Sequence, residues 1–113
     1  MSNYKAFTGT YPVSTTLTAK MVNDTLSGAF EGGSNYWIDS LKWDGNDRIV
    51  ILSDAPDLQS RVRPMNVDTI QAGVQWMAKN QPKHFSDMLT GNDDATTSDI
   101  LLQSILFQEI IFG

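Results

Sequence analysis

The chain has 113 residues, 41% of them hydrophobic, which suffices for one core, so we expect a single domain over residues 1–113. It contains no cysteine, which excludes a disulfide framework, a thiolate metal site and a cysteine nucleophile. Residues 84–113 hold five acidic side chains and no Lys or Arg, which accounts for the net charge of -5. This sign argues against general binding to a nucleic-acid backbone. The N-terminus lacks the apolar stretch of a leader peptide, so we expect a cytoplasmic protein.

The first two expected elements are an extended segment and a helix. Residues 4–17 are rich in Thr, Tyr and Val but are interrupted by Gly9 and Pro12, which favours an edge strand or an extended arm. Thr18 can then cap a helix over residues 19–30, in which apolar residues recur every three or four positions. Gly32 and Gly33 are suited to ending that helix.

A hairpin and a third strand are expected next. Trp37, Leu41 and Trp43 alternate with polar residues, a turn sequence occupies residues 44–47, and residues 48–52 form a short apolar run. Residues 53–59 have the composition of a surface loop. The alternation of charged and apolar residues at 61–63 then predicts a third strand before Pro64.

The remainder of the chain is predicted to be helical. Asn66 can cap a helix that ends near residues 80–82, and residues 84–89 add a further turn of helix. The last helix, from about residue 100, is apolar on almost every side, so it is either central in the domain or shared with a second subunit. The predicted fold is α+β, with a small antiparallel three-stranded sheet packed against about three helices.

Two stretches, together with the loop Asn92-Asp93-Asp94, resemble a group of small phage and prophage proteins. One is Phe30-Glu31-Gly32-Gly33-Ser34-Asn35-Tyr36-Trp37, similar to the group's Glu-Gly-Gly-x-Asn-Tyr-Trp pattern. The other is the ending, residues 106–113, similar to a Leu-Phe-x-Glu pattern that closes on an aromatic residue and Gly. The chain departs from the group at Gln108, where Gly is expected, and at Phe112, where Tyr is expected. The resemblance implies a phage-encoded origin and a shared fold, but no reaction.

The stretch from Glu31 to Trp37 is the first candidate site. Two glycines allow a close backbone approach to a ligand, while Asn35, Tyr36 and Trp37 offer hydrogen bonds and a stacking face. The alternative is structural, because a helix that turns sharply into a strand also requires glycines and accepts Asn in the turn.

Three arginines are the second candidate site. On the predicted sheet Arg61 and Arg63 share one face, with Arg48 on the neighbouring strand, and such a face can hold a phosphate or carboxylate. The alternative is a solvated face paired with aspartates. The full set of predicted ligand-binding residues is Asn35, Tyr36, Trp37, Arg48, Arg61 and Arg63.

We predict no catalytic residue, metal site or cofactor. Glu31 and Glu109 lie among apolar neighbours, an environment that a general acid or a metal site would use, but their spacing does not show that they meet, and we expect each at the rim or bonded to a nearby backbone turn. Residues 92–94 lack the later Glu of a calcium loop and are better suited to capping the last helix. His84 is the only histidine, which excludes a His-rich metal site.

From these features we expect a non-enzymatic phage accessory protein in the host cytosol that antagonises host defence. It is expected to act as a homo-oligomer and to bind either a small anionic, nucleotide-like ligand or a host protein, and not a membrane. The alternatives are an acidic inhibitor that mimics nucleic acid through Asp87, Asp93, Asp94 and Asp99, a small virion or assembly protein, and a metal-dependent hydrolase.

Overall fold

The computed structural model describes residues 17–113, so the extended segment predicted over residues 4–17 lies almost entirely outside the described residues. Helix α1 (Ala19–Gly28) begins where predicted, because the side chain of Thr18 accepts a hydrogen bond from the backbone N–H of Met21. It continues into η1 (Ala29–Gly33), a turn of π-helix that contains Gly32 at φ 154°. Only glycine adopts that backbone angle readily, which explains why the helix ends there.

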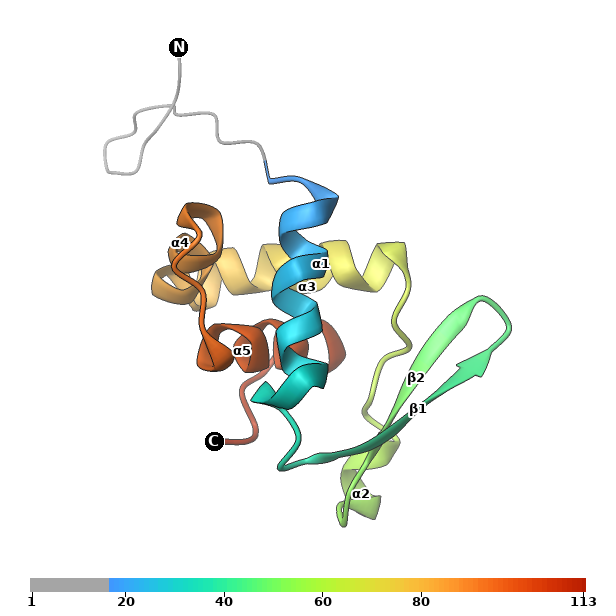
Figure 1. Ribbon diagram of the computed structural model, residues 1–113. Helices are drawn as coiled ribbons and strands as arrows, with labels where there is room; N and C mark the ends of the chain where they lie inside the picture. Colours follow the sequence, from blue (N-terminus) through green and yellow to red (C-terminus); the bar gives the residue numbers. More distant parts are fainter. Residues whose placement is uncertain (1–16) are drawn as a thin grey trace.

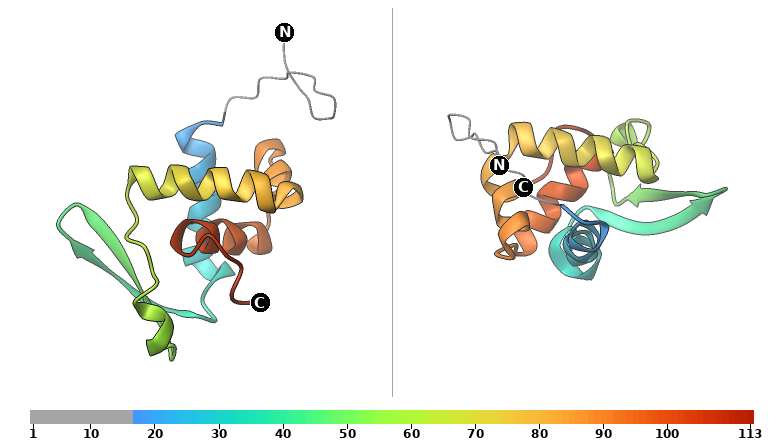
Figure 2. Two further views of the ribbon diagram at one scale, coloured as in Figure 1. Left: turned by 180° about the vertical axis from the view of Figure 1, so that it is seen from behind. Right: turned by 90° about the horizontal axis from the view of Figure 1, so that it is seen from above.

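The predicted hairpin is confirmed. Strands β1 (Ile38–Asp44) and β2 (Asp47–Leu52) pair antiparallel, with Trp43 opposite Arg48 and Leu41 opposite Val50. Gly45 in the connecting turn has a φ of 64°, as tight hairpin turns require. Figures 1 and 2 show this hairpin projecting from the side of the helical body.

The predicted third strand is wrong, and within residues 17–113 the sheet has two strands. The N–H of Arg63 donates to the carbonyl of Leu106 at the end of the last helix, 3.1 Å away, so this segment's backbone does not pair with β2. At the outer edge of β2 Met65 pairs with the strand through an isolated antiparallel bridge to Arg48. Pro64, which has no N–H to donate, lies just before that bridge.

The number of helices was also predicted wrongly, because the described residues form five α-helices and about three were expected. Residues predicted as a surface loop include the short α2 (Pro56–Gln59), which starts at a proline. Helix α3 (Val67–Asn80) is capped by Asn66, as predicted, in a reciprocal pair with Thr69. The expected extra turn is a separate helix, α4 (Pro82–Thr90).

Helix α5 (Ala95–Leu106) forms the centre of the domain, which is the first of the two alternatives that its apolar sequence allowed. Every residue from Thr97 to Leu106 is buried. Helices α1, α3 and α4 pack around it (Figure 1). Gly73 of α3 allows a close approach to α5, because a Cβ at that position would lie 2.5 Å from the Cα of Ile105. No helix among residues 17–113 is long and apolar enough to cross a membrane.

Candidate functional site

The stretch from Glu31 to Trp37 closes around one buried carboxylate on α5. Asp99 Oδ1 accepts hydrogen bonds from Ser34 Oγ and Trp37 Nε1, each at 2.7 Å. Asp99 Oδ2 accepts from the Tyr36 hydroxyl. Asp99 is only 7% exposed. Three donors from one short turn therefore satisfy this carboxylate, and they fix the path of the chain from η1 into β1.

Tyr36 is the exposed member of this group. Partial burial of the phenol, the hydrogen bond to Asp99 and the negative charge of Asp99 together raise the pKa of Tyr36 to about 12. The phenol therefore stays protonated at neutral pH and acts as a donor to Asp99. The arrangement holds the turn in place.

The ring of Trp37 is covered by the C-terminal segment. Phe112 stacks on it with ring centroids 4.7 Å apart and planes 10° from parallel, and Phe107 lies 6.1 Å away. Gln103 of α5 anchors this segment, because its Oε1 accepts from the backbone N–H groups of Ile111 and Phe112. Trp37 thus packs in the core, 2% exposed, with its ring against protein side chains.

The three predicted arginines make different contacts. The guanidinium of Arg48 lies over the ring of Trp43, 5.4 Å from its centroid. Arg61 follows α2 and forms an ion pair with Glu109 at 2.6 Å. Arg63 has no strand partner, since the predicted third strand does not form. Of the predicted ligand-binding residues, Tyr36 and Trp37 share the partner Asp99, and Asn35 is exposed beside them.

The candidate carboxylates Glu31 and Glu109 lie in different surroundings. Glu109 is paired with Arg61, whereas Glu31 lines a cavity next to the hairpin. Within the described part of the chain no three His, Asp or Glu side chains lie close enough to share a metal ion.

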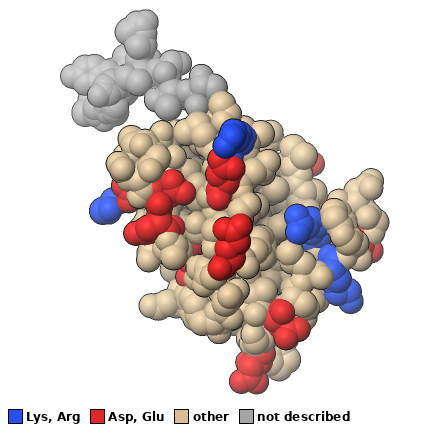
Figure 3. All heavy atoms as spheres, viewed as in Figure 1, with Lys and Arg blue, Asp and Glu red and all other residues tan. Residues whose placement is uncertain are grey.

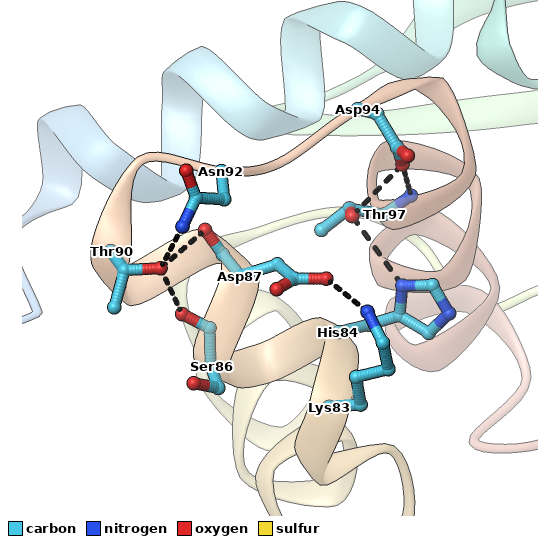
Figure 4. Close-up of polar contacts among 8 residues, drawn as sticks. All are labelled: Lys83, His84, Ser86, Asp87, Thr90, Asn92, Asp94 and Thr97. Carbon is cyan, nitrogen blue, oxygen red and sulfur yellow. Dashed lines mark hydrogen bonds and ion pairs between the residues drawn. The ribbon is translucent and has the colours of Figure 1, made fainter.

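The acidic loop before α5 caps that helix, as its composition predicted (Figure 4). Asp94 Oδ1 accepts from the N–H of Thr97 at 2.9 Å and from its hydroxyl at 3.1 Å. These hydrogen bonds from Thr97 lower the pKa of Asp94. His84 Nδ1 lies 3.4 Å from the same hydroxyl, so the histidine belongs to this capping network.

The surface best suited to binding lies on another part of the molecule, beside the projecting hairpin. Trp43 is 69% exposed and Val67 is 70% exposed. A cavity of about 550 Å³ under the hairpin tip is lined by both of them and by Arg48, Met65 and Ile70. Val67 and Ile70 continue into a groove of about 590 Å³ between α1 and α3. We call this surface, from Trp43 across Val67 to the groove, the hairpin face.

The sequence signal for the hairpin face was present but ambiguous. The alternation of Leu41 and Trp43 predicts that both point to the same side of the strand, and Val50 opposite Leu41 is fully buried. The hairpin extends past the helices, so the same side that is buried at its base is uncovered at its tip. Alternation in the sequence cannot reveal where a hairpin extends beyond the helices that pack on it.

The comparisons with known proteins add no further information on the site. No family model, curated protein or solved structure matches the chain.

Proposed function

We propose that this chain is a non-enzymatic phage accessory protein that antagonises host defence by binding a host protein through the hairpin face. The observation that carries the proposal is the exposed Trp43 with Arg48 stacked against it, next to the equally exposed Val67. Tryptophan and arginine are the residues most enriched among those that dominate protein–protein binding energies. The projecting hairpin makes them accessible to a large partner.

A protein partner fits this geometry better than a small anionic ligand does. Anion recognition needs several cationic donors converging on one point. Arg61 is engaged by Glu109, Arg48 lies on the hairpin, and the ring of Trp37 is covered by Phe112. These side chains, predicted to bind a nucleotide-like ligand, are thus each in contact with a different group of the protein itself.

The test is affinity capture from host lysate with the full chain and two variants. Trp43→Ser removes the exposed ring, whereas Lys42→Ser changes the neighbouring exposed residue, which points to the opposite side of β1. We expect a specific partner to be captured by the parent chain and by Lys42→Ser, and to be lost with Trp43→Ser. Equal capture by all three proteins would refute the proposed surface.

A second candidate function, mimicry of nucleic acid by an acidic surface, is favoured by the distribution of charge. Figure 3 shows acidic side chains gathered over α1 and over α4 with its following loop. The hydrogen bond from Thr25 to Asp93 joins these two areas. Asp99 is buried and does not contribute. Changing Asp87, Asp93 and Asp94 together to Asn abolishes capture under this alternative and leaves it intact under the hairpin-face proposal.

A further inference from the structure

The hairpin face has a protruding part, a middle and a recessed part. Trp43 protrudes at one end, 69% exposed. The groove between α1 and α3 is recessed at the other end, with a volume of about 590 Å³. Val67 and Ile70 line both the groove and the cavity beneath Trp43, so they lie between the two. Val67, at 70% exposure, is an uncovered apolar side chain in the middle of this face.

The groove is chemically suited to an aromatic side chain. Its apolar lining comes from Leu17, Val22, Ile70 and Val74, and its polar lining from Thr18 and the amides of Asn23, Gln71 and Gln75. No charged side chain is among the described residues that line it. A tryptophan ring buries a large apolar area and also carries an N–H, which side-chain amides can accept.

This order of features makes the face complementary to itself. In a two-fold symmetric dimer each copy presents the same patch, so a protrusion on one side of the axis meets a recess on the other. We infer that the hairpin face pairs with a second copy of this chain about a two-fold axis near Val67. Trp43 of each copy enters the α1–α3 groove of the other, and the two Val67 side chains pack together.

The distribution of charge permits this pairing. The exposed charged residues around the hairpin tip have both signs, with Lys42 and Arg48 basic and Asp44 and Asp68 acidic. The excess of negative charge belongs to residues 84–113, which include α4 and α5. Two copies that meet through their hairpin faces therefore do not bring these acidic segments into the contact, and charge repulsion between them is screened by distance and salt.

The inference rests on the proposed function in one respect, because both assign binding to the same face. A host protein and a second copy then compete for it, and the dimer is the form that exists when no host protein is present. The two proposals fail separately, since dimer formation is measured on the purified chain alone.

The first measurement is analytical ultracentrifugation of the full chain over a range of concentrations. We expect a mass that rises from 12.5 kDa to twice that value. Trp43→Ser is expected to weaken dimerisation by about 30-fold or more, as loss of a dominant interface residue does. Lys42→Ser should leave it unchanged. A chain that is monomeric at every concentration overturns the inference and leaves residues 1–16 or a host protein as the occupant of the groove.

The second measurement uses the absence of cysteine from the chain. In the Val67→Cys variant the two new thiols lie next to the axis, so mild oxidation should join two chains by a disulfide. Ala72→Cys places the thiol at an exposed position on the same helix that lines neither cavity, and it should react slowly. Equal rates of disulfide formation in the two cysteine variants would contradict the proposed axis. A dimer that persists in Trp43→Ser would contradict it as well.

Discussion

Replacing Asp99 should destabilise the domain more than replacing any other acidic residue in the described chain. Asp99→Ala leaves Ser34 Oγ and Trp37 Nε1 buried without acceptors and removes the partner of Tyr36. Each buried donor left unpaired costs about 1–3 kcal/mol. Two such donors and the lost charge-assisted bond give a loss of about 3–5 kcal/mol in the free energy of unfolding. The total free energy of unfolding of a small domain is about 5–15 kcal/mol, so this loss would be a large share of it.

The isosteric change Asp99→Asn separates charge from geometry. An amide oxygen still accepts from Ser34 and Trp37, but the bonds are no longer charge-assisted, so the expected loss is about 2 kcal/mol. Urea denaturation followed by tryptophan fluorescence gives these values. The control is Asp24→Ala, which removes an exposed ion pair with Lys20 and should cost less than about 1 kcal/mol. If Asp99→Ala loses no more than Asp24→Ala, the role assigned to Asp99 is wrong.

Three further predictions concern helix contact, backbone strain and pH. Gly73→Ala should lower the melting temperature sharply, because the new Cβ would lie 2.5 Å from the backbone of Ile105 in α5. The control, Ala72→Ser on the exposed side of α3, should change the melting temperature little. Gln108→Gly should stabilise the chain by up to about 1 kcal/mol in urea denaturation, since Gln108 has a φ of 50° that glycine adopts more readily, and a loss of stability would contradict this. The pKa of Tyr36 is raised from 10.0 to about 12 in the folded state, so stability should hold below pH 10 and fall as pH rises from 10 towards 12. Tyr36→Phe should reduce that alkaline loss, and an unchanged pH profile would count against it.

Features that depend on neighbours in the sequence could be predicted. Thr18 and Asn66 cap the helices they were expected to cap, and Asp94 caps α5. The hairpin also forms with its turn in the expected place. For the helices the signal is a side chain that accepts a hydrogen bond from a backbone N–H a few residues away. For the hairpin it is the alternation of apolar residues within one strand.

Features that depend on distant partners could not be predicted. The donors in residues 34–37 are explained by Asp99, more than sixty positions away, and their sequence is equally compatible with binding a ligand. Residues 61–63 alternate as a strand does, but the backbone N–H of Arg63 donates its hydrogen bond to the carbonyl of Leu106 at the end of α5. The lack of a side chain at Gly73 is what lets α3 and α5 touch, and this contact depends on Ile105, more than thirty positions away.

We place binding on the hairpin face and assign a structural role to the stretch from Ser34 to Trp37. Hydrogen–deuterium exchange of the full chain, with and without its captured protein partner, tests this most directly. We expect slower exchange in the β1–β2 turn and at the start of α3, with no change around Asn35. Slower exchange around Asn35 and Arg61, with the hairpin unchanged, would contradict it.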